Sequence, residues 1–115
     1  MLHLLSSEDI EMMFSCVKNH LTKNGYFAIH IFNPDLSILS RDPNERRLHH
    51  SYIDPKNGQK IIVEETIRYD KATQISHATL HQKSEDGTEH STPLDVRIFF
   101  PQELDMLLKH NGFKI

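Results

Sequence analysis

The sequence has no tryptophan, a single cysteine and no long hydrophobic run. With Cys16 alone, no disulfide can form within the chain, which is typical of a reducing, cytoplasmic compartment. The apolar residues 1–5 are too few for a signal-peptide core or a membrane span, so we expect no membrane association. Thirteen basic and 16 acidic residues are mixed along the chain, and without a basic block we expect no nucleic-acid partner.

Glycine is also scarce. The four glycines are widely separated, and each stands at an expected turn or helix end: Gly25, Gly58, Gly87 and Gly112. A nucleotide cofactor is commonly held by a glycine-rich turn of the G-x-G kind, where backbone N–H groups approach the phosphates. Since no two glycines are close together, the sequence contains no such turn.

The pattern of the first 34 residues predicts a helix followed by a buried strand. Apolar residues recur at helical spacing over residues 7–23, and Asn24-Gly25 is expected to end the helix, with Gly25 in the left-handed conformation. Residues 26–32 are almost continuously apolar apart from His30, which is typical of a strand covered on both faces. Asn33-Pro34 ends that segment, and residues 36–39 are expected to form a short helical turn.

The remainder predicts an antiparallel meander and a second helix. We expect strands at residues 46–53, 59–70, 74–83 and 88–100, joined by short turns. Apolar and polar residues alternate along the second strand, which indicates a sheet with one solvated face. Pro101 begins the last helix, Gly112 closes it, and residues 113–115 look like the start of another strand. The fold class is therefore α+β: helix, buried strand, four-stranded antiparallel meander, helix.

Nine histidines raise the question of a metal site. His77 and His81 share a strand face but should lie about 13 Å apart, too far for one ion. His49 and His50 should point to opposite faces if their segment is extended. We therefore predict no metal site.

Two stretches carry a resemblance when taken in this order: HLLSSEDIEMMFSCVKNHLTKNGYFAIHIFNP and, after the meander, RIFFPQELDMLLKHNGF. They resemble the C-terminal half of Rossmann-like, S-adenosylmethionine-dependent methyltransferases that have a β-meander inserted after the fifth strand. The likeness implies one partial domain over residues 1–115, divided into 1–34, 46–100 and 101–115. It implies a transferase for a small-molecule acceptor, with S-adenosylmethionine bound by the intact enzyme. This truncated chain alone is expected to bind no cofactor and to be inactive.

The resemblance also suggests roles for individual residues. His3 would lie near the cofactor, and His30 is a candidate catalytic base, although relatives often carry an acidic residue at its position. The candidate substrate-binding residues lie after the buried strand and along the meander, which would cover the acceptor: Phe32, Asn33, Arg46, His50, Tyr52 and Arg97. Structural alternatives remain for all of them. His30 can be a hydrogen-bonded histidine of a core strand, Asn33 a turn residue, and the meander a solvated sheet face with cross-strand charge pairs.

A different class of function fits the same elements. A helix, a meander and a second helix can fold as a two-layer, non-catalytic interaction domain. Its exposed sheet edges would then pair with a second copy, since an open edge is a template for another strand. A homo-oligomer is accordingly expected.

Overall fold

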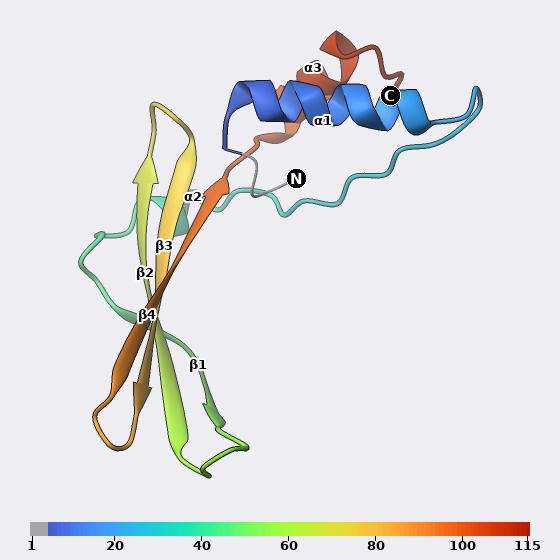
Figure 1. Cartoon of the computed structure of the whole chain (residues 1–115). Coiled ribbons are helices and arrows are strands. Elements are labelled where there is room, and N and C mark those ends of the chain that lie inside the picture. The colour runs from blue at the N-terminus through green and yellow to red at the C-terminus, as the bar shows by residue number, and fades with distance from the viewer. Residues whose placement is uncertain (1–4) are drawn as a thin grey trace.

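The computed structural model describes residues 5–115 and is elongated, with extents of 57 × 32 × 21 Å. Its radius of gyration is 18.4 Å, whereas a compact domain of this length has about 13 Å. Two helices form one end and a sheet forms the other, as Figure 1 shows. None of the helices within residues 5–115 combines the length and the hydrophobicity needed to cross a bilayer.

The first helix, α1, spans Ser7–His20. Ser6 caps its start by accepting a hydrogen bond from the Asp9 backbone N–H at 3.1 Å. The helix ends three residues earlier than predicted, with Leu21 as its C-terminal cap. Gly25 is not among the glycines with positive φ, so the expected left-handed cap at that residue is wrong. The chain leaves the helix in an extended conformation instead.

The predicted buried strand at residues 26–32 does not form. The segment is extended and runs back along the helical end toward the sheet, and it pairs with no strand in the described part of the chain (Figure 1). Phe27, Ile29 and Ile31 are half-buried against the helices, whereas Tyr26 is 97% exposed and Phe32 58% exposed. An apolar run reveals a tendency toward burial, but a strand also needs a neighbouring backbone, which residues 5–115 do not provide here.

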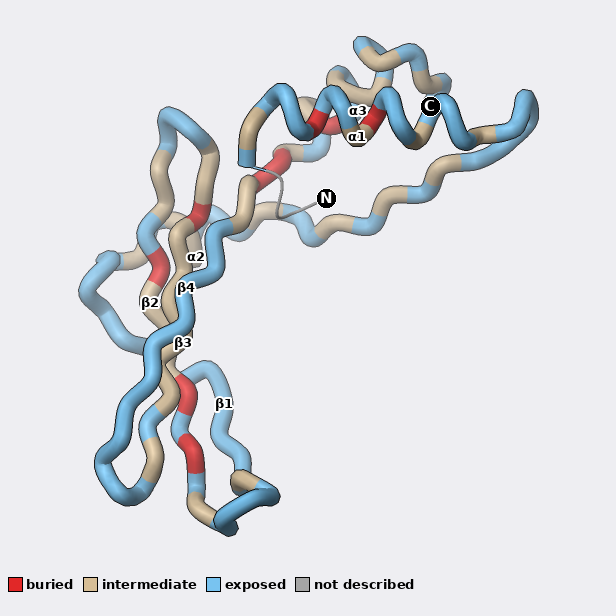
Figure 2. Tube along the Cα trace, in the orientation of Figure 1, coloured by how far each residue is buried: buried red, intermediate tan, exposed pale blue. Residues whose placement is uncertain are grey.

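The helical end has its own small core, visible as red segments in Figure 2. Its buried members are Ile10, Phe14, Phe99 and Leu104. Helix α3, Pro101–His110, supplies Leu104, and the last residues of the chain fold back so that the Phe113 ring lies 5.7 Å from that of Phe27. No strand is present at residues 113–115, so that expectation is also wrong.

The predicted antiparallel meander is confirmed, and with it the α+β class. Its strands lie in the order of the sequence: β1 (Arg47–Ile53), β2 (Lys60–Asp70), β3 (Ile75–Ser84) and β4 (Glu89–Arg97). On β2, Ile61, Val63 and Ile67 are buried, while the alternate residues face the other side and are more exposed. The last strand ends at Arg97, three residues before the predicted end, where the chain turns into α3.

A β-bulge interrupts the edge strand β1. Leu48 pairs with Glu64 and His50 pairs with Val63, so His49 is an extra residue without a partner on β2. The histidine rings therefore do not point to opposite faces: their Nδ1 atoms are 2.6 Å apart. The opposite edge, β4, carries Pro93 opposite Thr79.

Candidate functional site

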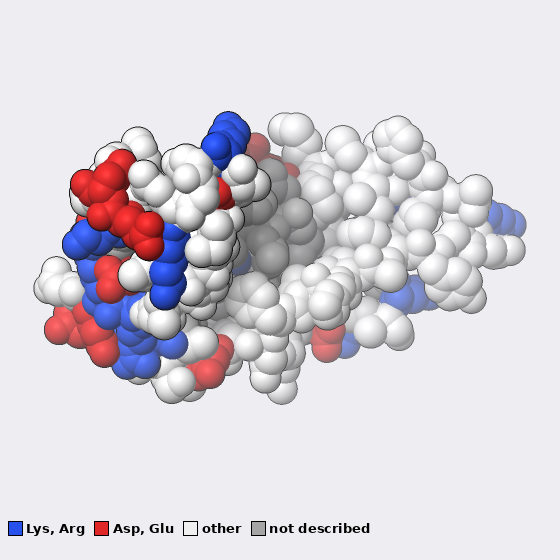
Figure 3. Space-filling view, turned by 90° about the horizontal axis from the view of Figure 1, so that it is seen from below, with Lys and Arg blue, Asp and Glu red and all other residues white. Residues whose placement is uncertain are grey.

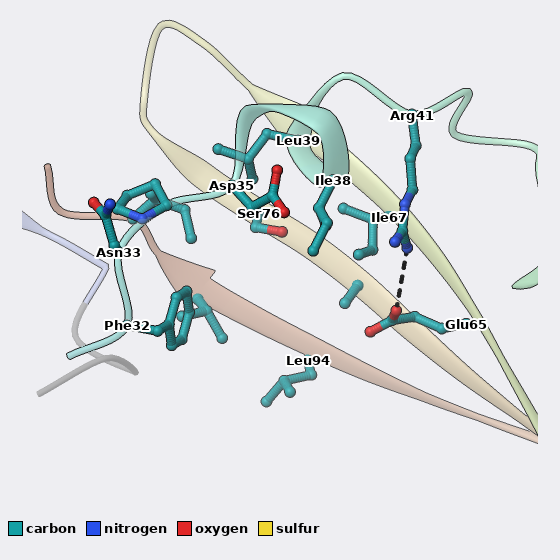
Figure 4. Close-up of a pocket in the computed structure, with 14 residues that line it drawn as sticks. Phe32, Asn33, Asp35, Ile38, Leu39, Arg41, Glu65, Ile67, Ser76 and Leu94 are labelled. Carbon is teal, nitrogen blue, oxygen red and sulfur yellow. Dashed lines mark ion pairs between the residues drawn. The ribbon is translucent and has the colours of Figure 1, made fainter. Parts of the chain in front are cut away.

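A groove of about 600 Å³ lies between the sheet and the segment that leads into it from the helical end (Figure 4). Strands β2, β3 and β4 provide its floor through apolar side chains of one face. These are Ile67, Ala78, Leu94 and Val96, continued by Ile98 after the strand. Phe32, Asn33 and helix α2 (Leu36–Leu39) form the other wall.

Asp35 caps the N-terminus of α2, the short helix that lies over the sheet. Its Oδ1 accepts hydrogen bonds from the Ser37 backbone N–H at 2.8 Å and from the Ser37 hydroxyl at 2.6 Å. These bonds, led by that from the hydroxyl, lower the pKa of the Asp35 carboxyl. The cap therefore fixes the one-turn helix whose Ile38 and Leu39 line the groove.

Two polar features interrupt the apolar lining. At one end, Arg41 forms an ion pair with Glu65 at 3.7 Å, with 20% and 23% of the two side chains exposed (Figure 4). On the floor, Ser76 is the buried polar residue of the sheet. An apolar pocket with a few polar groups is suited to a small organic molecule with one polar end.

The groove unites two of the residues predicted from the sequence, Phe32 and Asn33. His30 is two residues away, exposed to solvent, and is not among the described residues that line the groove. It is therefore no histidine of a core strand in this structure, and its role as a base stays a prediction. His3 lies outside the described residues.

Arg46 lies on the opposite face of the sheet. It forms ion pairs with Glu64 on β2 at 3.5 Å and with Glu89 on β4 at 2.9 Å. The hydrogen bond with Arg46 lowers the pKa of Glu89, and the same contact raises the pKa of Arg46. Charged side chains of both signs gather over the sheet end in Figure 3. The two ion pairs of Arg46 are cross-strand charge pairs of the kind that the structural alternative described.

His50, Tyr52 and Arg97 also lie apart from the groove. The rings of His50 and Tyr52 stack at 5.9 Å on β1, and Tyr52 borders a separate polar hollow of about 280 Å³. Arg97 donates to the Ser7 hydroxyl at 3.3 Å and lies 5.4 Å above the Phe99 ring. Arg97 thus joins the sheet to the helical end, whereas its neighbour Val96 lines the groove. The structure places His50 and Tyr52 side by side on β1 and Arg97 at the junction with the helical end, and the binding roles of all three stay predictions.

Sequence reasoning missed Arg41, Glu65 and Ser76. Glu65 offered a signal, since it interrupts the apolar alternation of β2 between Val63 and Ile67. A carboxylate on the buried face of a strand needs a partner or a function. Arg41 offered no comparable signal, because it lies in a polar connector whose path the sequence does not reveal.

Metal ligands do not gather in this groove. Across residues 5–115, no three or more His, Cys, Asp or Glu side chains are grouped so as to hold an ion. His77 instead contacts Asp95 at 2.8 Å, and His81 contacts Thr66 at 3.0 Å and Ser91 at 2.9 Å.

No family model, curated protein or solved structure matches this chain, so the site is interpreted from its own geometry.

Proposed function

We propose that this chain is the acceptor-side and lid portion of an S-adenosylmethionine-dependent methyltransferase for a small molecule, inactive without the rest of the fold. The observation that supports this most is the extended segment at residues 26–32. It is apolar, lies along two helices, and has no strand beside it in the described part of the chain.

Backbone N–H and C=O groups of an extended segment are normally paired when the segment belongs to a core. Here the inner row, Phe27, Ile29 and Ile31, already packs against α1 and α3, while the outer row includes the exposed Tyr26 and Phe32. Such a segment has the features of a strand in a larger sheet with helices on one face. Under this proposal, the missing strands carry the glycine-rich cofactor turn.

The groove supports the second half of the proposal. It opens where the extended segment ends, and in open α/β sheets ligands bind beyond the carboxyl ends of strands. Its volume of about 600 Å³ is in the usual range for small-molecule pockets. Methyl transfer is an in-line displacement in which the protein mainly aligns donor and acceptor. Phe32 and the Asn33 amide would orient the acceptor, and the meander would cover it.

Calorimetric titration with S-adenosylhomocysteine tests whether cofactor binding requires the part of the fold that carries the glycine-rich turn. The purified 115-residue chain is expected to show no micromolar binding. Saturable micromolar binding would contradict the proposal that the chain is incomplete. Reading the DNA upstream of Met1 provides an independent check: an in-frame strand followed by a G-x-G turn supports the proposal, and a stop codon with a ribosome-binding site opposes it.

The acceptor groove is testable once the chain is joined to such a cofactor half. Asn33→Ala should raise KM for the acceptor and leave the affinity for S-adenosylhomocysteine unchanged. Ser40→Ala, an exposed change just beyond α2, is the matched control and should alter neither quantity. Equal effects of both changes would remove the assignment of Asn33.

The second candidate function is a non-catalytic domain that self-associates. The exposed edge strand β1 favours it, because Leu48 is 70% exposed and Ile53 61% exposed. The edge strand β4 contains Pro93, which has no N–H to donate, so β1 is the better template for a second copy. Sedimentation equilibrium at high protein concentration should reveal a dimer, and a monomer throughout would exclude this candidate.

A further inference from the structure

We propose that His49 and His50 form a two-imidazole chelate for a divalent transition-metal ion, and that Cu²⁺ fits it best. This site is separate from the groove and does not depend on the methyltransferase proposal. It rests on the bulge in β1, which brings together two consecutive side chains that would point to opposite faces of a regular strand.

In a regular strand, neighbouring side chains point to opposite faces, so two consecutive histidines cannot bind one ion. At the bulge, His49 is an extra residue between the pairs Leu48–Glu64 and His50–Val63, and bulges are known to redirect side chains. The result is that the His49 and His50 rings lie 4.9 Å apart, centroid to centroid, with their Nδ1 atoms at 2.6 Å.

The contact requires one Nδ1 to carry a proton and the other to accept it. A metal ion can take the place of that shared proton, because neutral imidazole nitrogens are good ligands for Zn²⁺, Cu²⁺ and Ni²⁺. Both nitrogens then bind the ion, and the ring that carried its proton on Nδ1 carries it on Nε2 instead, so that both imidazoles stay neutral and no net proton is released. Water molecules would complete the coordination.

The distance between the nitrogens distinguishes the candidate ions. With metal–nitrogen bonds of about 2.05 Å, two ligands at right angles are about 2.9 Å apart, and two tetrahedral ligands about 3.3 Å. The observed 2.6 Å therefore has to open by only about 0.3 Å for a square-planar ion, against about 0.7 Å for a tetrahedral one. Cu²⁺ prefers the square-planar arrangement and also binds most tightly in the usual affinity order.

The surroundings leave the site accessible and partly ordered. Both histidines are exposed on an edge strand, so an ion can reach them without local unfolding. The Tyr52 ring stacks on His50 at 5.9 Å with an interplanar angle of 26°, which restricts the orientation of that imidazole. A restricted ligand loses less conformational entropy when it binds.

Titration with CuCl₂, followed by calorimetry and electron paramagnetic resonance, tests the site. All proteins should carry His3→Ala, so that the terminal amine and His3 cannot supply a second chelate. We expect one Cu²⁺ per chain and a spectrum with two nitrogen ligands. His49→Ala or His50→Ala should each weaken binding by at least about tenfold, since even the loss of outer-shell partners costs that much in established sites. His90→Ala, an exposed histidine on β4, should leave the affinity unchanged.

A further measurement keeps the test decisive. Circular dichroism shows whether each variant retains its strands. Loss of affinity with a retained sheet supports the chelate. Unchanged affinity in either His49→Ala or His50→Ala, an equal loss in His90→Ala, or no saturable binding in excess Cu²⁺ would overturn it.

Discussion

The side-chain amide of Gln74 donates a hydrogen bond to Glu103 Oε2 at 3.1 Å, which connects the β2–β3 turn with the first turn of α3. The same carboxylate oxygen accepts from the Phe100 backbone N–H at 3.2 Å, and the other oxygen lies 3.8 Å from Arg97. Glu103 therefore contacts the β2–β3 turn, the start of α3 and the end of β4, at the place where the sheet joins the helices.

Replacing Glu103 should loosen this junction. Glu103→Ala removes the acceptor of the Phe100 N–H at the start of α3 and the contacts with Gln74 and Arg97, so we expect the free energy of unfolding to fall by about 1–2 kcal/mol. Urea denaturation followed by circular dichroism measures the change. Asp105→Ala, an exposed carboxylate on the same helix, is the control and should have little effect. Equal losses in the two variants would contradict the role of Glu103.

Arg46 should govern part of the acid sensitivity of the sheet. Arg46 lowers the pKa of Glu89 in the folded state. The ion pair therefore stabilises the fold at pH values above the usual pKa of a glutamate. This stabilisation disappears as the pH falls through the lowered pKa. In Arg46→Gln, we therefore expect a lower free energy of unfolding at neutral pH and a smaller decrease on acidification.

The matched control for this change is Arg47→Gln, since Arg47 contacts Glu45 at 3.1 Å on the same short stretch. Urea denaturation at several pH values gives the comparison, and an NMR titration of the Glu89 carboxyl carbon gives its pKa directly. A Glu89 pKa that does not rise in Arg46→Gln would show that the ion pair is not formed in solution.

Asp35 should control the wall of the groove. Asp35→Ala removes the N-terminal cap of α2, whereas Asp35→Asn keeps an oxygen for the Ser37 N–H. We expect faster hydrogen exchange of the Ser37, Ile38 and Leu39 amides in the alanine variant only. In the unaltered chain, the protection of these amides relative to their intrinsic exchange rate should decrease as the pH falls through the lowered Asp35 pKa. Identical exchange in both variants would contradict the capping role.

The helical end and the sheet should open separately. Phe14→Ala creates a cavity among Ile10, Phe99 and Leu104 and should cost about 3–5 kcal/mol, with faster exchange in α1 and α3 but protected amides in β2 and β3. Val63→Ala should cost about 2 kcal/mol and produce the reverse pattern. Hydrogen exchange read by mass spectrometry distinguishes the two. If both changes expose both parts equally, the chain unfolds as one unit.

The sequence predicted the features that depend on local patterns. The meander follows from alternation and turn residues within hairpins, and both long helices follow from their apolar spacing, helped in the last one by Pro101 at its start. The site was predicted only in part. Phe32 and Asn33 were proposed only through the resemblance, and the groove residues Arg41 and Glu65 come from segments that approach only in three dimensions.

The errors in predicting strands share one physical origin, which is that strand pairing is a relation between two segments. Residues 26–32 have the composition of a strand but lack a described partner. The bulge at His49 depends on the register with β2, and nothing in the residues of β1 alone distinguishes it from a regular strand. The alternation of residues along one strand therefore predicts which face of the sheet each side chain occupies only where that strand pairs regularly with its neighbour.

The elongated outline has a consequence for how this protein behaves in flow. A radius of gyration of 18.4 Å is that of a compact domain of about 270 residues, more than twice the 115 present. A single chain will therefore experience the friction of a much heavier sphere and will leave a gel-filtration column early, where a globular dimer is expected. Light scattering, which reports mass independently of shape, should assign one chain to such a peak unless self-association is real.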